Sequence, residues 1–313
     1  MKSKVALCAD VGGTNTRIGV VREDGVVLSY RKALTPATAD AFIDVLAEEL
    51  TCNEHLMDSR LDSFLGVSIG IPGVVDPQTG FIRHVTNLPG WNDICLADMA
   101  GLALGVRVAV EHDVKLAMLG ENWMGAARGA LDMVYLNIGT GIAASFLSGG
   151  RIIRGSTGVA GSVGYLALSP GEVDERFDPN GYFEYSASGP GILRRAVQEG
   201  HLNCKTAHDV FDAADAGDDE VACRLVEAIV TEVGIAISAI VATLNPSAVV
   251  LGGGIGTRIC SRISRIREIV DRHVCMDARM VEVVKSELGD VAALVGGAAM
   301  FANSQYCPRY NNQ

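Results

Sequence analysis

The chain has 313 residues, 49% of them hydrophobic and 20% charged, which is enough to bury a large core and to form two lobes. The net charge of -11 and the pI near 5.0 argue against a nucleic-acid partner, because no basic stripe could follow a phosphate backbone. Small anionic ligands stay compatible with this charge, since local backbone dipoles can hold a phosphate. The eight cysteines are scattered without a CxxC pair, as expected of reduced core residues.

No targeting or membrane segment is expected. The apolar run at residues 5–9 is too short for a secretory signal, because Asp10 ends it. Later apolar stretches look too short or too charged to span a bilayer. We therefore expect a cytoplasmic protein with no membrane partner.

Short β-branched runs alternate with amphipathic helical stretches, the pattern of an α/β protein. In chain order, we expect strands at residues 5–9, 16–21 and 25–30, a helix at 37–50, strands at 64–69 and 107–110, and a helix at 113–124. Strands follow at 133–137 and 142–147, then helices at 190–199, 207–216 and 219–244, strands at 248–251 and 280–284, and a helix at 291–302.

Two parts of the sequence resemble each other. An apolar strand, a glycine turn and a second β-branched strand occur in ALCADVGGTNTRIGVV and again in VYLNIGTGIAASFL. Each reads as a β-hairpin whose turn carries two glycines and a threonine. The repetition predicts a duplicated architecture with a cleft between the halves.

The first glycine turn offers a phosphate several donors. Gly12 and Gly13 permit backbone conformations in which consecutive N–H groups point at one anion, and Thr14 adds a hydroxyl. Asp10, at the end of its strand, suits a divalent cation that bridges phosphate oxygens directly or through water. The alternative is a plain tight hairpin, for which glycines are also common.

Two further glycine turns follow apolar strands. The second turn has the same kinds of phosphate donor as the first but no acid like Asp10, and it consists of Gly139, Thr140 and Gly141. The third turn lets a flat or anionic group approach the backbone, and it consists of Gly252, Gly253 and Gly254. A competing interpretation uses the third turn alone. AVVLGGGIGTR resembles the start of a dinucleotide fingerprint, with acids at Glu268 and Asp271, and would indicate an NAD-dependent oxidoreductase. The full GxGxxG pattern is missing.

Several motifs together resemble the ROK family of repressors, open reading frames and sugar kinases. They are DVGGTNTR at 10–17, SIGIPGVVD at 68–76, TNLPGW at 86–91, IGTGI at 138–142, SASGPGI at 186–192, NPSAVVLGGGI at 245–255 and VGGAAM at 295–300. The resemblance covers the chain from about residue 5 to the final helix. It implies the two-lobed, actin-like ATPase fold of the ribonuclease H-like class, with ATP, Mg²⁺, a sugar in the cleft and usually a homodimer.

The resemblance also implies a division and a set of roles. Residues 1–112 form the N-terminal lobe, with the segment from about 291 to 313 packing back on it, and residues 113–290 form the nucleotide-side and dimerising lobe. The phosphate contacts are Gly12, Gly13, Thr14, Gly139, Thr140 and Gly141, the adenosine side is Gly252, Gly253 and Gly254, and Asp10 lies near the metal. Sugar contacts fall at Gly73, Thr86, Asn87 and Glu184. The family's repressors carry an N-terminal helix-turn-helix domain, whereas the first strand here is expected at residue 5, which disfavours DNA binding.

Asp113 matches the family's catalytic base. Phosphoryl transfer needs a carboxylate that orients the attacking hydroxyl and accepts its proton. A structural alternative is an N-cap for the following helix. His112 replaces the family's usual asparagine and could contact the sugar, favour the ionised form of Asp113, or be a half-buried histidine bonded to backbone. Lys115 and Glu111 are expected to be surface or helix-end charges.

A larger departure affects the sugar and zinc sites. Most family kinases have Ala-Gly-Glu-x-Gly-His where this chain has Ser162 and Tyr165, and no cysteine occurs in GEVDERFDPNGYFEYSASG at 171–189. We expect no structural zinc, with Tyr165, Tyr182 and Phe183 packing in its place. The prediction is a hexose or amino-hexose kinase with altered specificity, in which Ser162, Tyr165 and His112 face the sugar. The alternative is a non-catalytic sugar or nucleotide sensor of the same fold.

Overall fold

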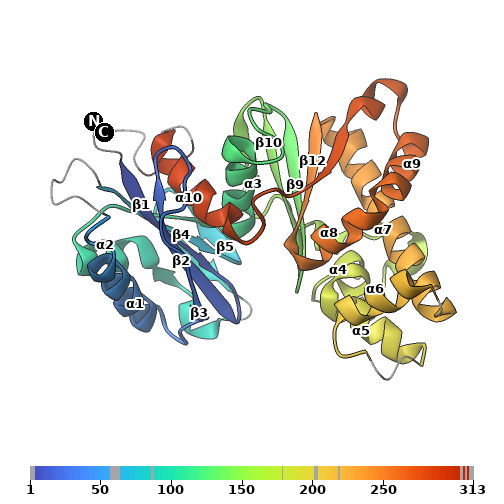
Figure 1. Cartoon of the computed structure of the whole chain (residues 1–313), viewed down its shortest axis with the longest axis horizontal. Coiled ribbons are helices and arrows are strands. Elements are labelled where there is room, and N and C mark those ends of the chain that lie inside the picture. The colour runs from blue at the N-terminus through green and yellow to red at the C-terminus, as the bar shows by residue number, and fades with distance from the viewer. Residues whose placement is uncertain are drawn as a thin grey trace. The chain divides into compact units, whose positions relative to one another are not determined.

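The computed structural model describes residues 4–56, 64–85, 88–177, 179–200, 204–217, 219–303, 306 and 309. The chain divides into two compact units (Figure 1). Unit 1 comprises Met1–Gly129, Arg154–Val159 and Leu288–Gln313, and unit 2 comprises Ala130–Ile153 and Ala160–Glu287.

Unit 1 is built on a five-stranded sheet with the order β3-β2-β1-β4-β8. Its strands are β1 (Val5–Val11), β2 (Asn15–Arg22), β3 (Arg31–Leu34), β4 (Phe64–Ile71) and β8 (Val108–His112). β1, β4 and β8 run parallel, whereas β2 is antiparallel to β1 and β3. The carboxyl ends of the three parallel strands therefore meet at one edge, where ligands of α/β proteins commonly bind.

Helices cover both faces of this sheet. The faces follow the two-residue period of β1: Leu7 packs in the cluster with α1 (Ala39–Cys52) and α2 (Leu96–Leu104). Cys8 points to the opposite face, where it packs with Leu294 of α10 (Ala292–Ala302). Burial on both faces explains why β1 is an almost continuous apolar run.

α3 (Asp113–Met124) packs closely against α10. A Cβ on Gly120 would lie 2.1 Å from the Ala292 carbonyl oxygen, and one on Gly296 would lie 1.8 Å from the Leu116 carbonyl oxygen. The two backbones approach this closely only because both positions are glycine. This packing places α3 in unit 1, which corrects the expected boundary at residue 113.

A three-stranded sheet adds to unit 1. It consists of β5 (Val74–Asp76), β6 (Phe81–His84) and β7 (Ile94–Cys95), which lie side by side in that order. Gly73 precedes β5 with φ of 103°, and a Cβ there would lie 2.2 Å from the His84 carbonyl oxygen. The glycine is thus required by the turn into the sheet.

Unit 2 repeats the strand order of unit 1 as β11-β10-β9-β12-β13. Its strands are β9 (Met133–Ile138), β10 (Ile142–Ser148), β11 (Arg151–Ile153), β12 (Ala248–Gly252) and β13 (Glu282–Lys285). Its helices are α4 (Tyr182–Ala187), α5 (Gly189–Gln198), α6 (Ala207–Ala216), α7 (Glu220–Leu244), α8 (Gly253–Ile259) and α9 (Ile263–His273). In both units an antiparallel hairpin is extended by two parallel strands, which confirms the predicted duplication.

Several elements differ from expectation. The helices predicted at 113–124 and 207–216 are confirmed. The strand predicted at 25–30 is wrong: β3 begins at Arg31, and residues 25–30 contribute one isolated bridge, Val21 to Val27. The sequence interpretation also missed β11, the helices α2, α4, α8 and α9, and the three-stranded sheet.

The expectation of no apolar stretch long enough for a bilayer is corrected by α7. This 25-residue helix is long and apolar enough to cross a membrane by length and composition. Its apolar side nevertheless packs in the core of unit 2, with Ile229, Val233 and Ile237 fully buried. A central helix of a folded core passes the same test, so α7 is weak evidence for a membrane span.

Candidate functional site

Two aspartates lie at the carboxyl edge of the parallel strands in unit 1. Strand register aligns Asp10 of β1 with Gly70 of β4, and Gly70 with Glu111 of β8. Asp113 begins α3 directly after β8. A Cβ on Gly70 would lie only 3.3 Å from the Asp113 Cα, so the missing side chain lets the start of α3 close onto the sheet. The fold therefore brings Asp10 and Asp113 into one electrostatic environment.

Asp10 is held by an arginine from the neighbouring strand. Arg17 Nη1 lies 3.4 Å from Asp10 Oδ2, and Arg17 Nη2 lies 2.9 Å from Asp290 Oδ1. Burial is the main reason that the pKa of Asp10 rises to about 7, with a further rise from Asp113, although Arg17 opposes both. A carboxylate so penalised would gain from a nearby cation. No group of three or more His, Cys, Asp or Glu ligands forms in the described ranges, so a cation at Asp10 would take its other ligands from phosphate and water.

The surroundings of Asp113 shift its pKa in the opposite direction to that of Asp10. Burial raises its pKa, but His112, the Val114 N–H and the charge of Lys115 together hold that pKa below its ordinary value. The Val114 N–H donates to Asp113 Oδ1 at 2.7 Å, and His112 Nδ1 lies 2.9 Å from the same oxygen. The same Val114 N–H also donates to His112 Nδ1 at 3.2 Å, so the imidazole and the carboxylate share this donor. Asp113 is thus an ionised carboxylate of fixed orientation.

The structure also assigns the helix cap at this junction. α3 begins at Asp113, and the residue in the cap position is His112, in an extended conformation. Asp113 is therefore the first helical residue and not the N-cap, which corrects the structural alternative. Its charge still suits the position, because anions are stabilised near a helix N-terminus.

The expectation that Glu111 and Lys115 are surface charges is wrong. Their exposed fractions are 1% and 3%. Glu111 Oε2 accepts from Arg154 Nη2 at 2.7 Å and from Arg154 Nε at 3.0 Å, and Lys115 Nζ donates to the Gly158 carbonyl oxygen at 2.9 Å. Buried charges require such partners. Both partners lie some forty residues downstream, so no local pattern could reveal the pairing.

The first glycine turn connects β1 to β2. The Gly12 N–H donates to the Asn15 carbonyl oxygen at 2.9 Å, and the Thr35 hydroxyl donates to the Gly12 carbonyl oxygen at 2.7 Å. Gly13 and Thr14 are exposed. Within the described part of the chain, their N–H groups have no hydrogen-bond acceptor. The turn is therefore fixed by its flanks and presents two amide donors, which is the arrangement that suits an anion.

In unit 2, the second glycine turn lies beside Glu184. The Gly139 N–H donates to the Gly141 carbonyl oxygen at 3.0 Å, and no acceptor among the described residues pairs with the N–H groups of Thr140 and Gly141. Glu184 Oε2 accepts from the Ile142 N–H at 2.7 Å. Burial raises the pKa of Glu184, and the Ile142 bond offsets part of this rise. Unit 2 thus gathers two amide donors and one carboxylate.

The third glycine turn joins β12 to α8. Gly253 has φ of 78°, and a Cβ there would lie 2.4 Å from the Ile138 carbonyl oxygen, so this position needs glycine. A Cβ on Gly252 would meet the Tyr135 hydroxyl, whereas Gly254 is exposed with His208 Nε2 3.6 Å from its Cβ position. A ligand can therefore reach the backbone at Gly254.

The dinucleotide interpretation of this turn is not supported. A ribose-binding acid belongs at the end of the next parallel strand. Glu268 and Asp271 instead lie exposed on α9, and β13 ends at Lys285. We therefore set aside the NAD-dependent oxidoreductase.

The residues expected at the sugar belong to both units. Gly73 precedes β5 in unit 1, and Thr86 and Asn87 lie outside the described residues. In unit 2, Ser162 is exposed at the start of the 3-10 turn Val163–Tyr165, and Glu184 contacts this turn, because a Cβ on Gly164 would lie 3.0 Å from Glu184 Cβ.

The aromatic residues near the cysteine-free segment differ from expectation. Tyr165 is 64% exposed and packs no core, and Phe183 belongs to the main core of unit 2. The rings that pack together are Phe177, Tyr182 and Tyr185, with Phe177 centroid distances of 5.1 and 5.0 Å in edge-on geometry. Of the three aromatic residues expected to pack together, Tyr182 takes part in this group. Tyr165 lies exposed on its 3-10 turn, and Phe183 packs in the core of unit 2.

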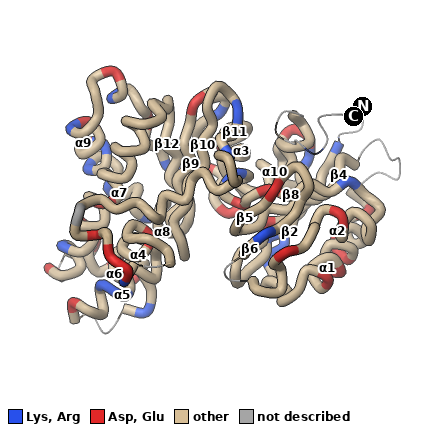
Figure 2. Tube along the Cα trace, turned by 180° about the vertical axis from the view of Figure 1, so that it is seen from behind, with Lys and Arg blue, Asp and Glu red and all other residues tan. Residues whose placement is uncertain are grey.

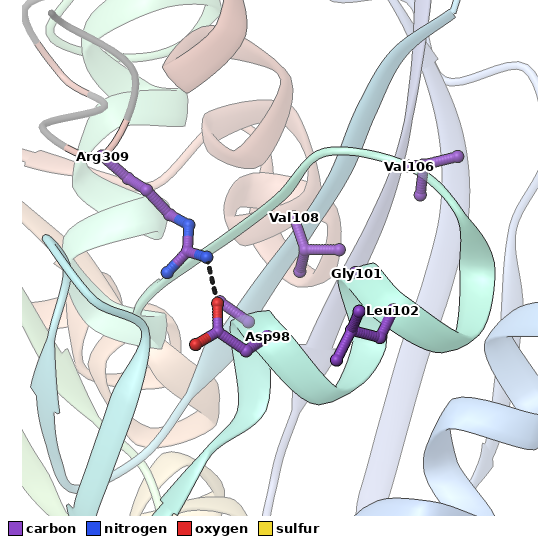
Figure 3. A pocket seen from close by; sticks show the side chains of 7 residues that line it. Asp98, Gly101, Leu102, Val106, Val108 and Arg309 are labelled. Carbon is purple, nitrogen blue, oxygen red and sulfur yellow. Dashed lines mark hydrogen bonds and ion pairs between the residues drawn. The ribbon is translucent and has the colours of Figure 1, made fainter.

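Other surface features do not add to the site. Figure 2 shows acidic segments on α1, α2 and α6, in keeping with the net charge of -11. A pocket beside α2 is lined by Leu102, Val106 and Val108, and its one carboxylate, Asp98, is paired with Arg309 (Figure 3). It contains none of the expected site residues.

Sequence reasoning missed several charged neighbours of the two aspartates. Arg17 stood within the motif DVGGTNTR, and its place on a strand antiparallel to that of Asp10 was a usable signal. Asp290 and Arg154 carried no such signal, because they reach unit 1 from distant parts of the chain.

Comparison with known proteins gives consistent results. A sequence model of the ROK family matches residues 6–304. A glucokinase of Halalkalibacterium halodurans is 31% identical over 92% of each chain. The bifunctional enzyme NanE/NanK of Brucella suis is 32% identical over 96% of this chain and 54% of its own length. A solved ROK family glucokinase from Streptomyces griseus, in complex with glucose and AMPPNP, superimposes with a TM-score of 0.78 at 26% identity, covering 95% of this chain and 98% of that one. The fold is that of the actin-like ATPases.

The electrostatic account predicts that Asp10→Asn stabilises the ligand-free protein at alkaline pH. The folded state keeps the Asp10 proton to about pH 7, whereas the unfolded state loses it near 3.8. The wild type therefore loses about 1.4 kcal/mol of unfolding free energy per pH unit between these values, and the variant does not. Urea unfolding should show the advantage of the variant growing by about 3 kcal/mol between about pH 5 and about pH 8.

A matched control is Asp24→Asn. Asp24 is exposed, and its hydrogen bond to Arg22 lowers its pKa, so this variant should gain no advantage as the pH rises. An Asp10→Asn advantage of equal size at both pH values would contradict the account.

Proposed function

This chain belongs to the ROK family, and on that premise we propose that it is an ATP-dependent sugar kinase acting on a hydroxyl of a hexose or amino-hexose, with Asp113 as its base. The observation that carries the proposal is the ionised Asp113 carboxylate at the carboxyl edge of the parallel strands of unit 1. The relatives named glucokinase support the reaction class.

Asp113 performs the proton transfer in this proposal. Phosphoryl transfer has a loose transition state, so a base mainly orients the attacking hydroxyl and accepts its proton. The Val114 N–H donates to Oδ1, and His112 Nδ1 lies 2.9 Å from the same oxygen. Oδ2 is the atom left to accept the proton of a sugar hydroxyl. His112, the Val114 N–H and Lys115 together lower the pKa of Asp113, which keeps this oxygen ionised at neutral pH.

Each unit by itself offers amide donors that suit a phosphate. The amides of Gly13 and Thr14 in unit 1, and of Thr140 and Gly141 in unit 2, offer donors to phosphate oxygens. Asp10 would hold Mg²⁺, and Arg17 fixes the Asp10 carboxylate from one side. When bound, Mg·ATP supplies the transferred phosphoryl group and neutralises its developing charge. Gly254, exposed at the start of α8, is the proposed approach of the adenosine moiety.

The sugar side departs from the usual family pattern. Glu184 supplies one carboxylate acceptor, and Ser162 stands where family kinases have a second. A site built around one fewer acid binds hydroxyls less tightly at that position, so the preferred sugar should differ from that of a glucokinase. His112 and Tyr165 complete the proposed set of chain-specific sugar contacts.

The test of the reaction is turnover by an Asp113→Asn variant. With Mg·ATP and a panel of monosaccharides, the wild type should release ADP with at least one sugar, and removal of Mg²⁺ by EDTA should stop it. Asp113→Asn keeps the shape of the side chain but loses the base, so kcat should fall by about 100-fold to 10,000-fold. Asp24→Asn, an equal change at an exposed ion pair, should retain activity. Equal turnover in Asp113→Asn would remove the base assignment, and a wild type without turnover would favour a sensor.

The same panel tests the altered specificity. The wild type should give its highest kcat/KM with a sugar other than glucose. Ser162→Glu restores the missing acceptor and should raise kcat/KM for glucose by about tenfold relative to the preferred sugar, as for one hydrogen bond to a charged group. A wild type that clearly prefers glucose over every other sugar would refute the specificity claim.

A further inference from the structure

Residues 154–159 form a short segment, here called the strap, that belongs to a different unit from the chain on either side. The chain leaves β11 of unit 2, contributes the strap to unit 1, and returns to unit 2 at Ala160. The strap has no regular secondary structure. Contacts outside regular strand pairing therefore hold it in place.

Two buried charges bind the strap at its two ends. Arg154 gives two hydrogen bonds to Glu111 Oε2, at 2.7 and 3.0 Å, and Lys115 Nζ donates to the Gly158 carbonyl oxygen at 2.9 Å. Between these ends the strap also passes β5, because a Cβ on Gly158 would lie 3.3 Å from the Val75 carbonyl oxygen. Isolated buried charges are unfavourable, so both side chains depend on these contacts with the strap.

The two anchoring residues flank the proposed base. Glu111 lies two residues before Asp113 and Lys115 two residues after it. The junction of β8 and α3 that presents Asp113 is thus attached to the strap from both sides. The family's usual pattern has asparagine where this chain has Lys115, so the second attachment belongs to this chain's own sequence.

The strap leads at once into the proposed sugar contacts. The Gly161 carbonyl oxygen accepts from the N–H groups of Ala144 and Val163, each at 2.7 Å, which fixes the chain to β10. Only Val159 and Ala160 separate this point from Gly158. Ser162 follows Gly161 directly, so the position of the strap sets how the chain enters the turn that carries this proposed sugar contact.

We propose that Lys115 and Arg154 are positioning residues that latch the strap to the base-bearing junction and thereby set the affinity for the sugar. The inference rests on the proposed kinase activity. Neither residue touches the reacting atoms. Their loss should therefore weaken sugar binding while leaving the nucleotide contacts at the glycine turns intact.

Kinetics of Lys115→Met and Arg154→Met test the latch. Each variant removes one hydrogen-bonding end while keeping an unbranched apolar stem of similar length. The KM for the preferred sugar should rise by about tenfold in each, and the KM for ATP should stay within about twofold. Lys115→Arg, which keeps a charged donor, should recover part of the sugar affinity. Equal rises of both KM values, or no rise in either variant, would overturn the proposal.

The matched control is Arg31→Met. Arg31 Nη1 binds Glu49 Oε1 at 2.6 Å, and Glu49 is buried like Glu111, but this pair lies between β3 and α1, away from the strap. Loss of this arginine also removes the ion-pair partner of a buried carboxylate, which keeps only the Asn53 amide at 3.2 Å, so general destabilisation should appear here as well. The sugar KM should not change in the control. A rise equal to that in Arg154→Met would show that loss of stability, and not the strap, explains the effect.

A second readout does not need kinase activity. The Arg154–Gly155 bond is a trypsin site inside the strap, and the Arg154 side chain is held in its ion pair. Tryptic cleavage after Arg154, followed by mass spectrometry, should be about tenfold faster in Lys115→Met than in the wild type or in Arg31→Met. Unchanged cleavage would refute the latch even if the chain is a kinase. Faster cleavage in a chain without turnover would refute the kinase and leave the latch standing.

Discussion

The site in unit 1 depends on the placement of two carboxylates at one edge of a parallel sheet. Asp10 and Asp113 repel each other in partly buried surroundings, where both cannot be ionised without compensation. The structure compensates them unequally. His112 and the Val114 N–H favour the charge on Asp113, whereas burial outweighs Arg17 at Asp10. Asp113 is thereby kept ionised, as a base must be, whereas a charge on Asp10 would be stabilised by a bound cation.

Packing at a distance maintains this arrangement. Gly70 lets the start of α3 approach the sheet, and Gly120 and Gly296 let α3 lie against α10 at backbone contact. Buried charges then fix the junction itself, through Glu111 to Arg154 and Lys115 to Gly158. Because α3 is held on several sides, the first residue of that helix has little freedom to move, as a catalytic carboxylate requires.

Local signals in the sequence predicted much of this fold. The helices at 113–124 and 207–216, the glycine turns and the duplicated strand order all follow from periodicity and turn chemistry over short stretches. The strand predicted at 25–30 does not form, because this stretch makes only the isolated Val21–Val27 bridge and regular pairing starts again with β3 at Arg31. Local pattern gave no means of finding the burial of Lys115 and Glu111, because charged residues are usually exposed and their partners come from the strap.

The candidate site was predictable to a similar extent. Asp10, Asp113 and the residues of the glycine turns could be proposed because each follows an apolar strand in a recognisable motif. Tyr165 was misplaced because sequence does not say on which side of a 3-10 turn a ring lies. Arg17, Asp290 and Arg154 act through tertiary contacts, which a single sequence does not reveal.

The unequal ionisation of Asp10 and Asp113 can be measured directly. Carboxyl carbon NMR of the ligand-free protein, with signals assigned through the Asp10→Asn and Asp113→Asn variants, gives the titration of each group. The account predicts that Asp113 titrates below the ordinary value of 3.8 and Asp10 near 7. Titration of both carboxyls together near 3.8 would contradict it.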